Sequence, residues 1–398
     1  MPVHKEIIGN PAPSQTSPRN SFLHRILEHV DLVERVHNIL SAASQANSSF
    51  QKGVQESSEG NFEVAIRHFD KAVKLKPKFA EAYLQRSRAY RELGSLDQAA
   101  EDYVRAIKLK PGMPEAAEYI NAISKTLNEG FSKILDEEFG GVGSLGATDW
   151  YLRALDCLER LDFRGVYHAL IKTTETNQLF AKAYSLRSYA FALGLRVFYD
   201  ESRMNGKIAL KLDPQLAEPH FAFAMIDYYS EKYLEAQGHI TKALELDPKS
   251  ADILFFKGII EKQLGNFEAA ITAYEKSICN QPRNPYISAL AYVELALLKE
   301  ATGNLSGALE NLNTVIELMH TRTDNRYIEM NLWDIVPNNL TYIIPLVTAY
   351  EARARVKNQL GDLDGSLDDL AEAIKIDMSW KAWPGDPWPD FSKWGKKR

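Results

Sequence analysis

The strongest constraint on how this chain can fold is a pattern that recurs every 34 residues. The first two copies match at Ala65 and Ala99, Phe69 and Tyr103, Ala72 and Ala106, and Pro77 and Pro111. The pattern returns with Ala209 and Pro214, Ala243 and Pro248, and Ser277 and Pro282. A fixed period of this length is typical of solenoids, in which each unit buries its apolar face only by stacking on its neighbours.

The repeated segments resemble the tetratricopeptide repeat. They read NFEVAIRHFDKAVKLKP, SLDQAAEDYVRAIKLKP, KYLEAQGHITKALELDP and NFEAAITAYEKSICNQP. In that family each unit is a helical hairpin with small residues at positions 8, 20 and 27, an aromatic residue at 24 and a proline at 32. The resemblance implies an all-α fold, a right-handed α-solenoid of stacked helical hairpins. Recognisable units lie at 46–79, 80–113, 183–216, 217–250, 251–284, 289–322 and 347–380.

The segments between these units predict the domain organisation. Residues 114–147 and 148–182 fit two degenerate repeats, and the glycine-dense stretch at 139–147 predicts a hinge between two arrays. The expected segments are a disordered N-terminus (1–20), an N-terminal capping helix (21–45), a first array (46–138), the Gly-rich hinge (139–147), a second array (148–378) with an insert (319–343), and a Trp- and Pro-rich tail (379–398).

The tail and the insert each have two interpretations. The tail contains Trp380, Trp383, Trp388 and Trp394, and its three prolines exclude a continuous helix. It either covers the end of the array, as terminal repeats require, or docks on a partner or in the array's own groove. The insert is long enough to be functional, and it either contacts a partner or packs on the last hairpins.

Charge and motifs argue against catalysis, cofactors and nucleic acid. The net charge of −6 does not favour a broad electrostatic grip on nucleic acid. No HExxH, CxxC, GxSxG, Walker or kinase motif is present, so we expect a non-enzymatic chain with no metal site and no cofactor. The acidic string starting at Asp362 fails as a calcium loop, because Leu367 and Ala373 stand where Gly and Glu are needed. No apolar run reaches the ~18 residues that span a bilayer, and no secretory signal precedes the repeats, so we expect a cytoplasmic protein without an integral membrane segment.

The resemblance also implies a concave groove lined by the first helix of each hairpin. Co-chaperones of the family hold a C-terminal carboxylate with Lys and Asn at positions 5 and 9, but here these positions hold Phe50 and Val54, and Arg187 and Phe191. We therefore expect no carboxylate-clamp chaperone partner. The second array instead places large apolar side chains toward the groove, namely Phe221, Met225, Tyr228, Tyr229, Phe255, Phe256 and Ile259. Packing within or between hairpins is the alternative for each of them.

The first array differs, because its corresponding positions predict a polar surface of mixed charge: Glu81, Gln85, Arg88, Arg91 and Glu92. Together these features predict a non-catalytic scaffold or assembly adaptor that binds a peptide or an amphipathic helix of a protein partner. Two alternatives stay open. One is an autoinhibited regulator gated by the tail or the insert, and the other is a non-catalytic subunit of an enzyme complex. The fold does not choose between them, since solenoids serve unrelated functions.

Overall fold

The computed structural model describes residues 40–127, 145–159, 162–193, 198–280, 285–320 and 345–381. Regular structure in these residues is helical, with no β-strand, which confirms the all-α prediction. Several expected segments lie outside the described residues. They are the N-terminus (1–20), most of the capping helix (21–45), most of the hinge (139–147), the insert (319–343) apart from residues 319 and 320, and the tail (379–398) beyond Lys381.

The chain divides into two compact units, Met1–Gly94 and Ser95–Arg398. The first unit contains a helix over residues 40–58, α2 (Phe62–Leu75) and α3 (Ala80–Glu92). The second contains α4 (Leu96–Leu109), α5 (Pro114–Leu127), α7 (Ala147–Glu159), α8 (Phe163–Thr176), α9 (Ala181–Ala192), α10 (Tyr199–Leu212), α11 (Glu218–Tyr229), α12 (Tyr233–Leu246), α13 (Ala251–Gln263), α14 (Phe267–Cys279), α15 (Pro285–Ala301), α16 (Leu305–His320), α18 (Pro345–Gln359) and α19 (Leu363–Lys381).

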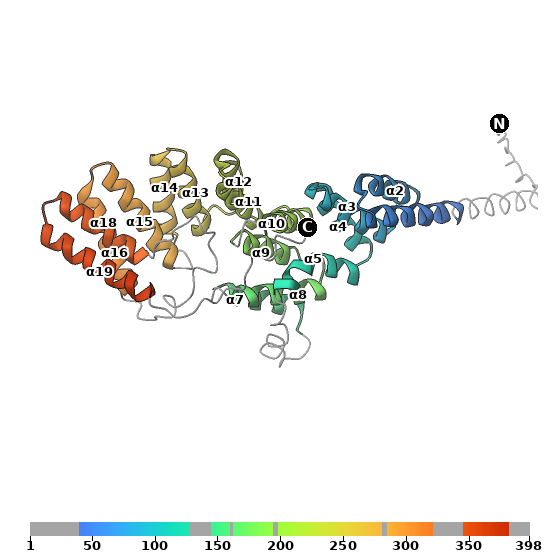
Figure 1. Cartoon of the computed structure of the whole chain (residues 1–398), viewed down its shortest axis with the longest axis horizontal. Coiled ribbons are helices and arrows are strands. Elements are labelled where there is room, and N and C mark those ends of the chain that lie inside the picture. Colours follow the sequence, from blue (N-terminus) through green and yellow to red (C-terminus); the bar gives the residue numbers. More distant parts are fainter. Residues whose placement is uncertain are drawn as a thin grey trace, which may run out of the picture. The chain divides into compact units, whose positions relative to one another are not determined.

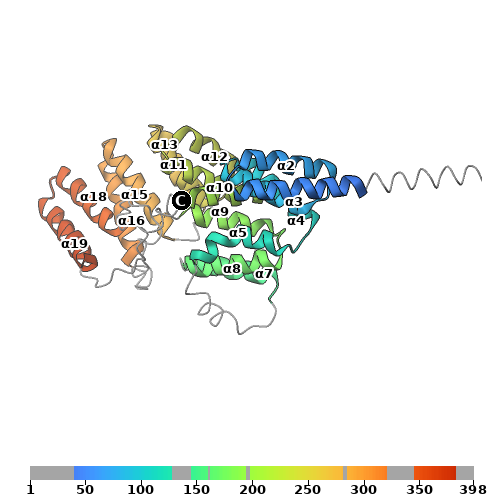
Figure 2. The ribbon, with the colours of Figure 1, turned by 45° about the vertical axis from the view of Figure 1, so that its right-hand side comes forward.

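The second unit is a row of helical hairpins, as the repeat predicts. The helices pack in pairs, α7 on α8, α9 on α10, α11 on α12, α13 on α14, α15 on α16 and α18 on α19. Consecutive hairpins also touch, through α12 and α13, α14 and α15, and α16 and α18. The helices α15, α16, α18 and α19 follow one another in both views (Figures 1 and 2). This arrangement is the α-solenoid that the resemblance implies.

The residue types at the repeat positions explain the close packing. Ala99, Ala236 and Ala270, which stand at position 20, have no exposed surface. At position 8 of the first unit, a Cβ on Gly53 would come within 2.6 Å of the Phe69 ring, so only glycine lets these two helices approach so closely. Gly265 ends the first helix of its hairpin with a φ of 80°, a conformation that glycine adopts without strain. The period therefore reflects inter-helix packing directly.

Two features differ from the sequence prediction. The division between the units falls at Gly94 and not at the glycine-dense stretch 139–147. Helices from before and after that stretch pack together, α4 on α10 and α5 on α8. In addition, α9 begins at Ala181, two residues before the predicted start of its repeat. A hydrogen bond joins it to α10, in which Ser202 Oγ donates to the Ser188 carbonyl at 2.7 Å. The start of α9 could not be placed from the sequence, because no proline of the repeat pattern stands before it at the end of 148–182.

Candidate functional site

An aromatic cluster runs across the first helices of three consecutive hairpins, α9, α11 and α13. The Tyr189 ring lies 5.5 Å from Phe221, and Phe221 lies 5.6 Å from Phe256. Tyr228 lies 5.4 Å from both Phe256 and Tyr229. Most of these pairs are edge-to-face, the geometry that the quadrupole of the aromatic ring favours. We call Tyr189, Phe221, Tyr228, Tyr229 and Phe256 the aromatic cluster.

The local sequence brings the two tyrosines of α11 to the end of their helix. Pro219 stands in the first turn of α11, where its missing N–H costs nothing. The helix ends after Tyr229, and Glu231 follows with a positive φ of 63°. On α13, Ser250 caps the N-terminus by accepting a hydrogen bond from the Ile253 N–H. These ends place Tyr228 and Tyr229 opposite Phe256.

The structure corrects part of the predicted groove. Phe221, Met225, Phe255 and Phe256 are only 7%, 3%, 6% and 4% exposed, so they are core residues and not accessible anchors. The reason is that α11 packs against α9, α10, α12 and α13, and α13 packs against α11, α12, α14 and α15, so neither helix keeps a broad free face. Tyr228, Tyr229 and Ile259 are half-buried, and so is Tyr189, which the sequence reasoning did not select. A role for the half-buried residues in partner binding stays a prediction.

A second constellation, centred on Arg187, was not found from the sequence. Its side chain has no exposed surface. One guanidinium nitrogen donates to Asn121 Oδ1 at 2.7 Å, and the other to the Leu170 carbonyl at 2.9 Å and Thr174 Oγ1 at 3.0 Å. Burial lowers the pKa of Arg187, while Tyr184 and further neighbours partly offset that shift. Arg187 thus joins α5, α8 and α9 through neutral acceptors and does not face a groove.

Two buried tyrosines extend this network to α4. The hydroxyls of Tyr103 and Tyr184 lie 3.2 Å apart, and Tyr184 donates to the Gln178 carbonyl at 2.9 Å. Gln178 in turn donates to the Met113 carbonyl at 2.7 Å. Burial raises the pKa of Tyr184 to about 12, although the Tyr103 hydrogen bond and the Arg187 charge act in the opposite direction. We call Arg187 and its neighbours, with these tyrosines, the Arg187 network. Both terminal guanidinium nitrogens are hydrogen-bonded, while the buried Nε of Arg187 and Nδ2 of Asn121 have no partner among the described residues, and the complete burial of the group indicates a structural role.

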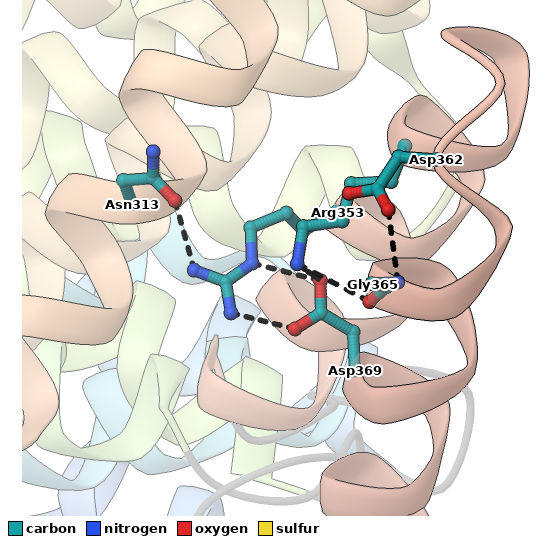
Figure 3. Close-up of polar contacts among 6 residues, drawn as sticks. Asn313, Arg353, Asp362, Gly365 and Asp369 are labelled. Atoms are coloured by element: carbon teal, nitrogen blue, oxygen red, sulfur yellow. Dashed lines mark hydrogen bonds and ion pairs between the residues drawn. The ribbon is translucent and has the colours of Figure 1, made fainter.

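The acidic string that fails as a calcium loop forms a structural cluster instead (Figure 3). Arg353 makes a bidentate pair with Asp369, with bonds of 2.9 and 2.6 Å, and reaches Asn313 at 2.8 Å. Asp362 accepts from the Gly365 N–H at 3.0 Å, as a helix N-cap does. Burial would raise the pKa of Asp369, but the bonds from Arg353 and Lys357 outweigh it and the pKa is lowered. These residues tie α19 to α18 and α16.

His220 and His239 are the only described histidine pair whose rings stack, with centroids 6.1 Å apart. Burial, followed by the mutual repulsion with His239, lowers the pKa of His220. In the part of the chain that the structure describes, no three His, Cys, Asp or Glu side chains gather into a potential metal site. The histidine rings pack on each other and on Phe223, across α11 and α12.

Among the described helices, none combines the length and apolarity needed to cross a membrane.

The polar surface predicted for the first array maps to α3. Glu81, Gln85, Arg88 and Arg91 are half-buried there, and Glu92 is exposed. In the same unit Arg86 pairs with Asp70 at 2.5 Å and lies over the Tyr83 ring. The helix buries small residues and Leu84, so its packing leaves the charged side chains at the surface.

Comparison with known proteins agrees with the fold. The family model described as tetratricopeptide repeat matches residues 55–114 and 221–286. Superkiller protein 3 of Schizosaccharomyces pombe is 22% identical over 267 residues, which are 66% of this chain and 17% of that protein. Tetratricopeptide repeat protein 16 of Mus musculus is 23% identical over 255 residues, 58% of this chain and 32% of that protein. The chain thus spans less than a third of the length of these relatives.

One further relative and one solved structure are also similar to this chain. A TPR repeat-containing protein of Methanocaldococcus jannaschii is 31% identical over 88 residues, 22% of this chain and 26% of that protein. The crystal structure of MamA protein superposes with a TM-score of 0.34 and 16% identity, covering 61% of this chain and 98% of MamA. The family match, the named relatives and the stacked hairpins agree with one another. The chain is a tetratricopeptide repeat protein, and its fold is in general that of a protein-interaction scaffold.

Proposed function

We propose that this protein is a non-catalytic scaffold or assembly adaptor that binds an apolar peptide or amphipathic helix of a partner over Tyr189, Tyr228, Tyr229 and Ile259. The observation that supports this is the continuity of the aromatic cluster across α9, α11 and α13. Half-buried tyrosines are typical interface anchors, because an apolar ring and a polar hydroxyl are presented together.

The buried members of the cluster would act as a rigid floor. Phe221 and Phe256 hold the tyrosine rings by edge-to-face and stacked contacts, so little side-chain freedom remains to be lost on binding. An amphipathic helix presents apolar side chains at i, i+3, i+4 and i+7, a spacing that suits anchors distributed over successive parallel helices. Affinity would come from these anchors, and specificity from the polar groups around them.

The test compares the variant Tyr228→Ala/Tyr229→Ala/Ile259→Ala with a matched control, Leu234→Ala/Phe267→Ala. The control removes apolar side chains that are 71% and 52% exposed on α12 and α14 and are not members of the cluster. Proteins retained by the wild type from native lysate are identified by mass spectrometry, and the binding segment of each is then titrated as a peptide. We expect the cluster variant to bind this peptide at least about 30-fold more weakly, the effect of losing a hot spot worth about 2 kcal/mol.

Circular dichroism first shows that both variants are folded. Equal affinity of the wild type and the cluster variant for the same peptide would move the binding surface away from α9, α11 and α13. Should the triple variant unfold, Tyr229→Ala alone is measured, since it truncates one half-buried ring at a helix end.

A further inference from the structure

The last described helix, α19, presents an apolar stripe to solvent. Leu363, Leu367, Leu370 and Ile374 recur at helical spacing and are 61%, 65%, 40% and 58% exposed. The opposite face of the helix, with Asp369 and Ala373, is buried against α18. We call the four exposed residues the α19 stripe. A contiguous apolar surface of this kind marks a place where something else binds.

The other hairpins indicate how a surface at this repeat position is normally covered. Leu370 stands at position 24, where Tyr103, Ile240, Tyr274 and Leu312 of other hairpins have no exposed surface. In those hairpins the second helix packs on the next helix along the chain, as α12 does on α13, α14 on α15 and α16 on α18. No described helix follows α19. The α19 stripe is therefore a stacking face whose usual cover is missing from the described residues.

We propose that residues 382–398 of this chain fold back over the α19 stripe. These 17 residues follow α19 directly and contain Trp383, Trp388, Phe391 and Trp394. Each such ring can bury about 150–250 Å², so the segment carries enough apolar surface to replace a hairpin face. The stripe runs from Leu363 to Ile374, roughly 16 Å along the helix. An extended chain of 17 residues reaches up to roughly 56 Å, which is ample for a reversal and a return.

The sequence of the segment fits a reversal of direction. The Pro384–Gly385 pair, which begins three residues after the end of α19, is the combination that the two central positions of a type II turn favour. The further prolines oppose a continued helix. A chain that turns there runs back toward the start of α19. Its basic end, Lys396, Lys397 and Arg398, would then meet the exposed carboxylates of Asp364 and Asp368.

The basic end of this segment is the reason to prefer it to a second copy as the occupant, because it complements the exposed carboxylates of Asp364 and Asp368. The fold-back also leaves the aromatic cluster on α9, α11 and α13 untouched. The proposal therefore stands or falls independently of the proposed function.

The test is a cycle of four full-length chains. They are the wild type, a stripe variant (Leu367→Gln/Ile374→Gln), a tail variant (Trp388→Ser/Phe391→Ser/Trp394→Ser), and the combination of the two. We expect each variant to lower the Tm by an amount on the order of 4 °C, and the combination to lower it no further, because both remove one contact. The control pair Leu234→Gln/Phe267→Gln, also exposed and apolar, should shift the Tm equally in the wild-type and tail-variant backgrounds.

Hydrogen exchange with mass spectrometry supplies a second readout. Peptides from residues 382–398 should exchange on the order of tenfold faster in the stripe variant than in the wild type. Additive Tm shifts with a fast-exchanging tail in the wild type would overturn the proposal. A dimer that dissociates only in the stripe variant, seen by sedimentation, would overturn it by assigning the face to a second copy, and stripe-dependent capture of another protein would overturn it in favour of a partner. Leu367→Gln alone replaces the double change if that chain does not fold.

Discussion

The Arg187 network and the aromatic cluster both join successive hairpins of the Ser95–Arg398 unit, but they do so with opposite chemistry. In the network a buried guanidinium is surrounded by the neutral acceptors of Asn121, Leu170 and Thr174. In the cluster the contacts are between rings, such as that of Phe256 with Phe221 and Tyr228. The acceptors of the network lie in the degenerate repeats (114–182), whereas Arg187 itself and the whole aromatic cluster lie in repeats that follow the pattern.

This difference teaches what each kind of interface contributes. Apolar contacts supply stabilisation that varies smoothly with the area buried, and they tolerate exchange of one large side chain for another. A buried polar network permits only the arrangement in which every group is satisfied, because each unpaired group costs free energy. The Arg187 network thus fixes which helices meet where the repeat pattern is weakest, and the aromatic cluster supplies stability where the pattern is strong.

The largest expected effect comes from truncating Phe256, a buried member of the aromatic cluster. Phe256→Ala should lower the free energy of unfolding by about 4 kcal/mol, because it removes a buried ring and leaves a cavity. Phe267→Ala, the same change at a ring that is 52% exposed, should cost no more than about 0.5 kcal/mol. Urea unfolding followed by circular dichroism measures both, and equal losses would mean that Phe256 is not a core residue.

Removing the centre of the polar network should cost somewhat less. Arg187→Met should lower the free energy of unfolding by about 3 kcal/mol, since the buried acceptors of Asn121 and Leu170 lose their donor. Arg67→Met, at an exposed position of α2, is the control. An unchanged or higher stability of Arg187→Met would show that the desolvation free energy of the guanidinium equals or exceeds the stabilisation from its hydrogen bonds. The two regions would then not differ in how they stabilise the fold.

A third test concerns the close packing at Gly206 on α10, between the two regions. A Cβ there would lie 2.6 Å from the Phe223 ring and 2.8 Å from Ser188 Oγ, so Gly206→Ala should cost about 2 kcal/mol through overpacking. Gly238→Ala on α12 meets nothing within 4 Å and should instead stabilise the helix by about 0.5–1 kcal/mol. Opposite signs in thermal unfolding are the expected result, and a stabilising Gly206→Ala would mean that Phe223 moves aside freely.

The smallest effect is a change in pH dependence that only the polar region should show. Because the pKa of Tyr184 is raised to about 12, its contribution is complete below pH ~10 and is lost as the pH rises toward about 12. Tyr184→Phe should cost about 1 kcal/mol at neutral pH, through the lost bond to Gln178, and should make the alkaline loss of stability shallower. Unfolding at a series of pH values checks this, with Tyr233→Phe as the control, and parallel curves for wild type and Tyr184→Phe would refute it.

Much of the fold follows from local periodicity. The helices α2, α4, α12 and α14 end near the prolines that the pattern supplies, and the small residues Ala99, Ala236 and Ala270 are buried as expected. A side chain at a fixed repeat position meets the same neighbours in every hairpin, so one sequence suffices to place it. The same argument identifies Leu370 as a stacking residue, although the sequence alone does not say that it is exposed.

The sequence by itself therefore determined the all-α class, the hairpin and the positions at which helices approach closely. Only the tertiary structure decided that Phe221, Met225, Phe255 and Phe256 are core residues, because α11 and α13 are apolar on more than one face and periodicity cannot then separate a buried face from a binding face. Only the structure also revealed the burial of Arg187, since its partners Ile120 and Asn121 lie more than 60 residues away along the chain. Local patterns record what neighbouring residues require, whereas the satisfaction of a buried charge depends on segments that meet only in the folded protein.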